Sequence, residues 1–128
     1  GSGRRVDRAV PGGEAYEVHR DYDVKLVQAD VKDGKNANKF YVIQVLRRAD
    51  GGFAAFNRWG RVGEEGESKL YPFDGEADAI KAFEAKFKDK TKNTWAAFVA
   101  GSFVKNEGSG GKYGVLELDG SGGDGADE

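Results

Sequence analysis

The chain has 128 residues, a formal net charge of -2, no cysteine and one histidine, His19. This length predicts one domain with tails, large enough to bury a modest core. The absence of cysteine excludes disulfides and thiolate metal sites and fits a reducing compartment. A single histidine excludes histidine-rich zinc sites. No apolar run reaches the length of a membrane span.

The charge distribution is more informative than the net charge. Residues 117–128 contain five acids and no base, so residues 1–116 carry twenty bases against seventeen acids. Residues 39–61 contain five bases and one acid, and residues 81–92 contain five bases and two acids. Local basic zones of this kind attract a polyanion, although an ordinary solvated surface is the alternative interpretation.

The two ends differ from the middle in composition. Residues 1–15 predict a flexible leader that begins with a Gly-Ser-Gly tag remnant. Residues 120–128 are acidic and glycine-rich, which is typical of a linker or tail. Residues 16–119 are therefore expected to form the single domain.

Strand patterns fill the first part of this domain. Residues 23–31 alternate partly, and residues 33–38 predict a turn. Residues 39–47 are apolar on nearly both faces, which predicts a central strand. A hairpin turn at residues 49–52 leads into a strand at 53–59, and a glycine-rich turn at 60–66 leads into a strand at 67–73.

The period then changes from two to about 3.6 residues. Apolar side chains recur at helical spacing at Ala79, Ile80, Phe83 and Phe87, which predicts a helix that ends near residues 91–93. Asp74 is its expected N-cap.

Three aromatic residues beyond the helix, Trp95, Phe98 and Phe103, are expected to pack under the following loop, before a last short strand at 113–118. The predicted fold class is α+β, a small antiparallel β-sheet with one α-helix packed on one face.

Catalytic signatures are not apparent. The sequence has no nucleophile with an evident base partner, no distinguished carboxylate pair, no H-E-x-x-H and no P-loop. The glycines at positions 60, 63 and 66 do not follow a strand and open a helix, as a dinucleotide-binding loop requires. A turn and a bulge between strands is the better interpretation of these glycines, and an enzyme fragment with an unseen site is the weakest hypothesis.

The sequence N-R-W-G-R at residues 57–61 has two interpretations. Trp59 either packs at the edge of the core or provides a plate for a ligand. Arg58 is expected to point away from the Trp59 side, and Arg61 to return to it. A ring beside a guanidinium suits a nucleotide, because the ring packs on a base or sugar and the arginine makes forked contacts with phosphate.

The neighbouring strand offers further polar groups. Lys39 opens it, and Asn36 and Asn38 lie in the loop before it. Amide side chains contact phosphate and sugar. For Asn36, a simple turn residue remains the preferred interpretation.

Four motifs in chain order carry a family resemblance. They are N-K-F-Y-V-I-Q-V-L, N-R-W-G-R-V-G-E-x-G-x-S-K-L, A-x-x-x-F-E-x-K-F-x-D-K-T-K-N-x-W and G-K-Y-x-x-L-E-L. Over residues 16–119 the chain resembles the WGR domain of DNA-dependent poly(ADP-ribose) polymerases. The sequence departs from the family pattern after N-T-W, where it reads A-A-F-V-A-G, and in an extended loop at residues 107–110.

The resemblance implies a function at DNA breaks. It implies binding near the 5′ terminus, largely without reading sequence, with Trp59 packed against the sugar of the terminal nucleotide. It implies that Arg61 contacts DNA and relays the signal to helical regulatory and catalytic domains. Asn38 and Tyr113 are then expected beside the 5′ phosphate, and these domains and 5′-phosphorylated ends are the expected partners.

Charge alone adds Lys39 and Lys112 to the expected DNA-binding residues. The His-Tyr-Glu signature of ADP-ribosyl transfer is absent, so we expect no catalytic residues, no metal and no cofactor in this domain, and an NAD-dependent parent enzyme. We also expect a nuclear, monomeric protein that does not bind membranes. The alternative hypothesis is an interdomain docking module for which DNA contact is incidental.

Overall fold

The computed structural model describes residues 5–28, 31–32, 35–36, 38–102 and 114–115. Seven strands are assigned within these ranges: β1 (Tyr16–Gln28), β2 (Val31–Lys32), β3 (Lys35–Asn36), β4 (Lys39–Arg48), β5 (Phe53–Arg61), β6 (Glu67–Phe73) and β7 (Gly114–Val115). The helical elements are a short 3₁₀ turn η1 (Gly13–Ala15), the long helix α1 (Glu76–Thr91) and the short helix α2 (Trp95–Val99).

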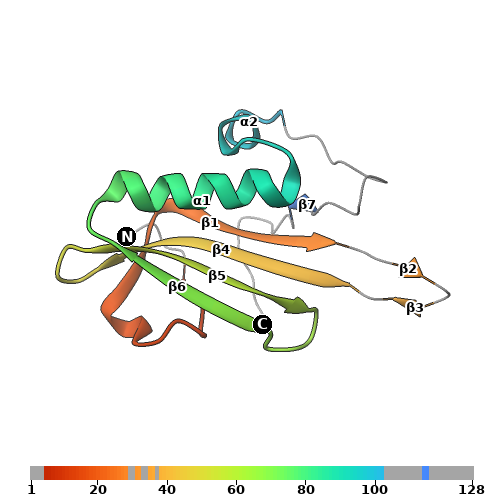
Figure 1. Cartoon of the computed structure of the whole chain (residues 1–128), viewed down its shortest axis with the longest axis horizontal. Helices are drawn as coiled ribbons and strands as arrows, with labels where there is room; N and C mark the ends of the chain where they lie inside the picture. The colour runs from red at the N-terminus through yellow and green to blue at the C-terminus, as the bar shows by residue number, and fades with distance from the viewer. Residues whose placement is uncertain (1–4, 29–30, 33–34, 37, 103–113, 116–128) are drawn as a thin grey trace.

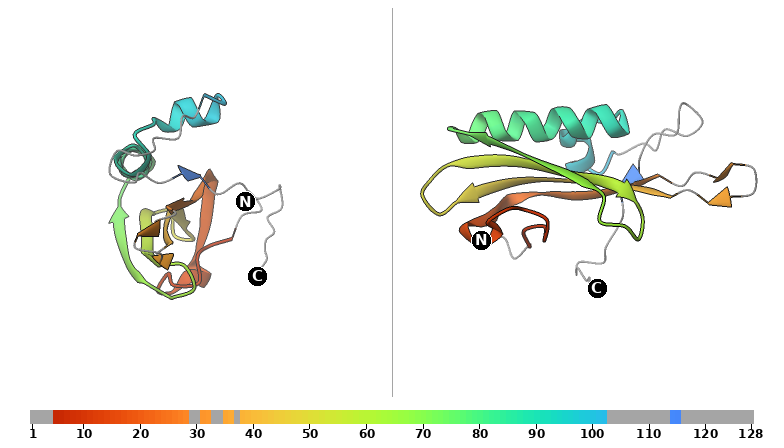
Figure 2. Two further views of the ribbon diagram at one scale, coloured as in Figure 1. Left: turned by 90° about the vertical axis from the view of Figure 1, so that its right-hand side faces the viewer. Right: turned by 60° about the horizontal axis from the view of Figure 1, so that its bottom comes forward.

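The main sheet has the strand order β6-β5-β4-β1-β7, and every pairing in it is antiparallel. Strands β2 and β3 form a separate two-stranded ribbon, which projects from one end of the sheet (Figure 1). Helix α1 lies across one face of the main sheet, and α2 folds back beside it (Figures 1 and 2). The predicted α+β class is confirmed.

Strand β4 lies at the centre of the sheet because both of its faces are apolar. Every residue from Phe40 to Leu46 is buried. Odd-numbered positions such as Ile43 face the core beneath α1, and Leu46 joins a second core on the opposite face.

The core beneath α1 is built from helix and strand side chains together. Its buried members are Val24, Leu26, Tyr41, Ile43, Val45, Ala79, Phe83, Phe87 and Trp95. The Trp95 ring meets Phe83 and Phe87 edge-on, at centroid distances of 4.8 and 5.1 Å. Trp95 and Phe98 were expected to pack under a loop after the helix, but they lie on a second helix, α2, and pack against the core beneath α1. Phe103 lies outside the described residues.

The N-terminal segment differs from the expected flexible leader. Residues 5–15 pack against the face of the sheet opposite α1, where Val10 is buried with Val18 and Phe56 (Figure 2). Apolar residues spaced among charges gave no periodic signal for this packing. The domain limits at residues 16 and 119 stay predictions.

The element ends correct several further expectations. Strand β1 begins at Tyr16, well before residue 23, and a register shift between Val18 and Asp23 bends it. The N-cap of α1 is Gly75 and makes no side-chain cap bond, so the prediction of Asp74 is wrong. The helix ends at Thr91 as expected, with Lys92 in the left-handed conformation.

The structure also differs from the sequence in the bounds of one predicted turn and of one predicted strand. The turn expected at 33–38 includes the short strand β3. Of the strand expected at 113–118, only Gly114 and Val115 are described, and they pair with β1. At the opposite edge, β6 carries mostly exposed side chains and one proline, Pro72.

Candidate nucleic-acid interface

Trp59 lies two residues before the end of β5. Its cross-strand partner is Tyr41, and the two rings stack with centroids 5.6 Å apart and planes 14° apart. Trp59 is half-buried at the border of the core beneath α1, whereas Tyr41 is buried within it. The indole is therefore held by packing and is partly open to solvent, so it can both fill the core edge and meet a ligand.

Arg61 and Lys39 form the next cross-strand pair on the same face, two residues beyond these rings. Both are exposed, and residues two apart along a strand share a face, so both belong to the Trp59 side. Within the described ranges, neither side chain is engaged in an ion pair. Two free cations beside an aromatic ring are suited to an anionic ligand with a flat or sugar component.

Gly66, at the end of the loop at residues 62–66, has a clear steric reason to be glycine. Gly66 packs so closely on β5 that a Cβ on it would lie 2.1 Å from the Trp59 carbonyl oxygen, and its φ is +78°. The predicted glycine-rich turn is confirmed, although β5 extends through Gly60 to Arg61 before the turn begins. Gly60 and Gly66, which approach each other closely, therefore serve a tight backbone crossing rather than a phosphate loop.

This loop also fixes the backbone of Asn38. The Val62 amide donates to the Asn38 carbonyl oxygen at 3.0 Å, and the Glu64 amide donates to that of Arg61 at 3.0 Å. The Asn38 residue itself is exposed. The structure therefore brings four predicted site residues to the same ends of β4 and β5: Asn38, Lys39, Trp59 and Arg61.

Lys112 and Tyr113, the other two predicted site residues, lie outside the described residues.

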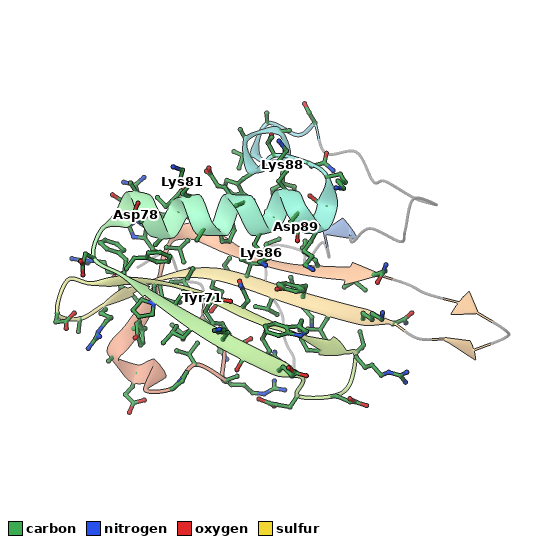
Figure 3. All side chains as sticks on the ribbon, viewed as in Figure 1. Tyr71, Asp78, Lys81, Lys86, Lys88 and Asp89 are labelled. Atoms are coloured by element: carbon green, nitrogen blue, oxygen red, sulfur yellow. The ribbon has the colours of Figure 1, made fainter. Side chains whose placement is uncertain are left out.

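Helix α1 brings additional basic groups to this region. The Lys90 ammonium lies 4.9 Å from the centroid of the Tyr41 ring, on which Trp59 also stacks. Lys86 lies on the sheet side of the helix, whereas Lys81 and Lys88 lie on its outer side (Figure 3). Side chains from the basic zone at residues 81–92 thus lie beside the basic zone at residues 39–61. A count of charges along the chain could not determine this arrangement.

Acidic groups border the same region. Glu67 is the cross-strand partner of Trp59 on β6, and Glu64 and Glu65 are exposed in the preceding loop. These carboxylates limit how far the positive potential extends toward β6. The basic side of this surface is therefore the side of Lys39 and Lys90, although Lys90 Nζ also lies 3.8 Å from Asp89 Oδ2.

Arg58 does point away from the Trp59 side, as predicted, but the sequence gave no indication of its partner. It is buried, and its Nε donates to both carboxylate oxygens of Asp7, at 2.9 and 3.1 Å. A second missed residue is Asn57 on the Trp59 side of β5, whose buried Oδ1 has no hydrogen-bond partner among the described residues.

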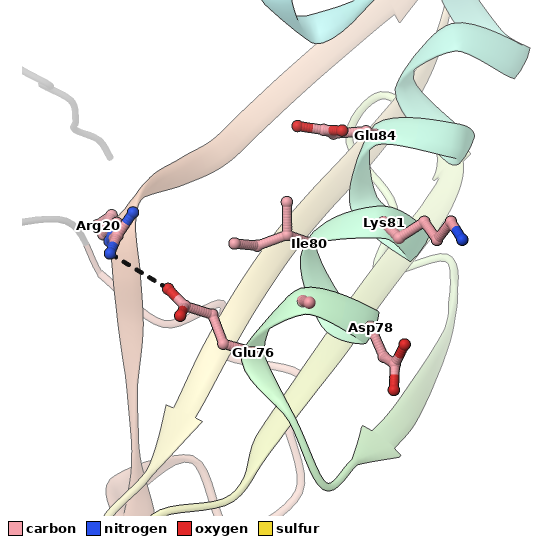
Figure 4. Close-up of a pocket in the computed structure, with 7 residues that line it drawn as sticks. Arg20, Glu76, Asp78, Ile80, Lys81 and Glu84 are labelled. Atoms are coloured by element: carbon pink, nitrogen blue, oxygen red, sulfur yellow. Dashed lines mark ion pairs between the residues drawn. The ribbon is translucent and has the colours of Figure 1, made fainter.

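A separate polar cluster lies at the first turn of α1 (Figure 4). Glu76 Oε2 accepts a hydrogen bond from His19 Nε2 at 2.6 Å and lies 3.3 Å from Arg20 Nη2. The His19 hydrogen bond and, to a smaller extent, the charges of Arg20 and His19 lower the pKa of the Glu76 carboxyl, against a raising effect of desolvation. This cluster ties α1 to the bend of β1.

The same cluster borders a pocket lined by Arg20, Glu76, Ala77, Asp78, Ile80, Lys81 and Glu84 (Figure 4). The pocket lies at the start of α1, whereas Lys90 lies in its last turn. The pocket is therefore not part of the surface around Trp59. In the part of the chain that the structure describes, no group of three or more potential metal-binding side chains occurs, and no helix is suited to cross a membrane.

The sequence matches the WGR domain family over residues 22–101. This match covers more than half of the chain, and the chain therefore belongs to the WGR domain family.

Its relatives include protein mono-ADP-ribosyltransferase PARP3 from Homo sapiens, 44% identical over 116 residues, which are 89% of this chain and 20% of the relative. Poly [ADP-ribose] polymerase 2 from Homo sapiens is 40% identical over 100 residues, 77% of this chain and 16% of the relative. Poly [ADP-ribose] polymerase 2-A from Oryza sativa subsp. japonica is 49% identical over 77 residues, 59% of this chain and 11% of the relative. The chain spans a fifth or less of the length of these three relatives.

Proposed function

We propose that this WGR domain binds DNA breaks at the 5′ terminus and relays binding to the regulatory and catalytic domains of a nuclear ADP-ribosyltransferase. The observation that carries the proposal is the Trp59 ring, stacked on Tyr41 and flanked by the exposed Arg61 and Lys39. An aromatic platform needs an unstacked nucleotide face, which a duplex offers only at its end.

The chemistry of the surface also argues against sequence reading. Recognition in the major groove needs a helix or ribbon with base-contacting side chains. Helix α1 instead lies on the sheet and presents lysines on its outer side (Figure 3). Lysine contacts with phosphate are independent of sequence and sensitive to salt, so affinity should fall as ionic strength rises.

In this proposal the residues have distinct roles. Trp59 packs on the terminal sugar, while Asn38 and Lys39 approach the 5′ phosphate together with Lys112 and Tyr113. Arg61 contacts DNA and carries the interdomain signal. The domain acts as a monomer without a cofactor of its own, and NAD is the substrate of the parent enzyme.

The test is fluorescence anisotropy with a labelled duplex end, with and without a 5′ phosphate, against a closed circle of the same sequence. We expect the open phosphorylated end to bind more tightly, and Trp59→Ala to remove most of that preference. A second site variant is Arg61→Ala, and its matched control is Arg47→Ala. Arg47 is also an exposed arginine, but it lies at the end of β4 opposite to the end that pairs with Arg61. Equal affinity for open and closed DNA would refute the terminus-binding role.

A second candidate function is interdomain docking with incidental DNA contact. Val62, which follows Arg61 directly, is 52% exposed and offers an apolar contact to a protein surface. Under this function Trp59→Ala leaves DNA binding nearly unchanged.

The relay role in the first proposal has its own test. In the full-length parent, Arg61→Ala should reduce DNA-stimulated activity more than DNA affinity, and equal reductions would contradict the relay role.

A further inference from the structure

An ion pair between Asp7 and Arg58 joins the N-terminal segment to the middle of the sheet. The two side chains are only 8% and 9% exposed, and they are 51 positions apart in sequence. Burying two charges is costly unless each is well paired and hydrogen-bonded. Both conditions are met here, because Arg58 Nε donates to both oxygens of the Asp7 carboxylate.

The same guanidinium reaches the loop that follows Arg61. Arg58 Nη1 donates to the backbone oxygen of Glu65 at 2.8 Å, and the Arg58 guanidinium lies 4.9 Å from the centroid of the Phe40 ring. Phe40 also contacts the close approach at Gly66, where an added Cβ would lie 3.1 Å from its ring. One buried cation thus connects Asp7 to the end of the loop.

The N-terminal strap, which we define as residues 5–10, is held by further contacts that do not involve Arg58. The Asp7 amide donates to Gln44 Oε1 at 3.0 Å, and Gln44 Nε2 donates to the Arg5 carbonyl oxygen at 2.9 Å. Val10 is buried in the second core. The strap is therefore fixed to the central strand and can serve as a rigid support.

We infer that Asp7 and Arg58 are positioning residues for the DNA-terminus site, because the strap holds the loop that sets Arg61 and Asn38. The inference rests on the proposed function. The loop follows Arg61 directly, the Val62 amide donates to the Asn38 carbonyl oxygen, and Arg58 donates to the Glu65 carbonyl oxygen near the end of the loop. Arg58 lies on the face opposite Trp59, so it acts through the loop and not by touching DNA.

The first test is Asp7→Asn, because a charge effect and a positioning effect would change the affinity for DNA in opposite directions. Removing one negative charge near a polyanion site should strengthen DNA binding if Asp7 acts only through charge. If Asp7 positions the loop, affinity for the open end should fall by about tenfold, because small misplacements of a contact group are costly. Asp50→Asn is the control, since it removes the same charge in the β4–β5 hairpin at the opposite end of the strands.

A second variant protects the test against loss of the fold. Asp7→Leu combined with Arg58→Met leaves the net charge unchanged and no buried charge unpaired, and such apolar replacements are often neutral or stabilising. It should stay folded at the temperature of the binding assay, which thermal unfolding followed by circular dichroism checks. It should nevertheless bind the open end less tightly, and its Val62 and Glu64 amides should exchange hydrogen faster.

The outcomes separate the strap from the proposed function. A folded Asp7→Asn protein that binds the open end as tightly as wild type, or tighter, would overturn the inference. Wild-type affinity in the double variant would do the same. If the wild type itself does not prefer open ends, the proposed function fails. Hydrogen exchange of the Val62 and Glu64 amides still decides whether the strap holds the loop. Faster exchange in the variants supports the inference, and unchanged exchange overturns it.

Discussion

Replacing Gly66 with alanine should disrupt the backbone crossing behind Trp59. The new Cβ would lie 2.1 Å from the Trp59 carbonyl oxygen, whereas ordinary contact begins at 3.4 Å, so the chain must move by about 1.3 Å. The atom in the way belongs to the backbone of β5 and cannot rotate aside. Gly63→Ala is a matched control, because Gly63 also has a positive φ, +97°, but no atom of the described residues lies within 4 Å of the added Cβ.

The difference between the two variants isolates the steric term. The left-handed conformation alone should cost either variant about 1–2 kcal/mol. Forcing atoms into a filled space should add about 1–3 kcal/mol for Gly66→Ala only. The summed cost is then about 2–5 kcal/mol for Gly66→Ala and about 1–2 kcal/mol for Gly63→Ala. Taking about 5 °C per kcal/mol for a domain of roughly this size, Gly66→Ala should unfold about 10–25 °C below wild type and Gly63→Ala about 5–10 °C below it.

Thermal and urea unfolding followed by circular dichroism provide the measurement, and anisotropy with an open DNA end provides the functional readout. Gly66→Ala should also weaken binding to the open end, because Trp59 and Arg61 are displaced with the backbone. Equal destabilisation of the two variants would refute the reasoning, since the close approach would then contribute nothing.

Three further predictions follow from the site and the core. Phe83→Ala should lower the free energy of unfolding by about 3–5 kcal/mol, because Phe83 is fully buried, whereas Val99→Ala, at 67% exposure, should change it by less than about 0.5 kcal/mol in urea titrations. Lys39→Gln should reduce the slope of log affinity against log salt by about 0.9, the value for one phosphate contact, and an unchanged slope would remove Lys39 from the interface. The pKa of the Glu76 carboxyl is lowered from its ordinary value of 4.5. The ionised carboxylate therefore stabilises the fold at any pH above 4.5, and this stabilisation is lost as the pH falls through the lower pKa of the folded state. Glu76→Gln should therefore destabilise the protein at neutral pH but little in strong acid, and a pH-independent difference in urea titrations would exclude the charge as the cause.

Periodic elements could be predicted from the sequence because their signals are local. The apolar run of β4 and the spacing of Phe83 and Phe87 each identify an element without reference to the rest of the chain. The hairpin at residues 49–52 is confirmed, since Arg48 and Gly52 pair through their backbones at 2.7 Å.

The features that were missed depend on contacts distant in sequence. Asp7 and Arg58 carry no sign in the sequence that they form a pair, and Val10 is an isolated apolar residue among charges. Helix α2 has only five residues, too few to show a period, although its N-cap Thr94, which accepts a bond from the Ala97 amide, was a usable signal. Gly75 serves as the N-cap of α1 in an extended conformation, so a preference for aspartate at that position led to the wrong residue.

For the candidate site, the sequence was sufficient for Trp59, Arg61, Lys39 and Asn38 to be placed at neighbouring strand ends. It was not sufficient for Lys90, whose position over Tyr41 depends on how α1 crosses the sheet. A helix-to-sheet crossing is set by packing of the whole core and has no signature in a short motif.

The composition of β6 has a consequence for self-association. An outer strand leaves one row of backbone amides and carbonyls available to a strand from another molecule. In the described sheet, β6 is outermost, and it combines the charges of Glu67 and Lys69 with Pro72, which has no amide hydrogen to donate. A strand added at this edge would lie against those charges and would find no amide at Pro72, so the described edge is a poor template for amyloid-like stacking.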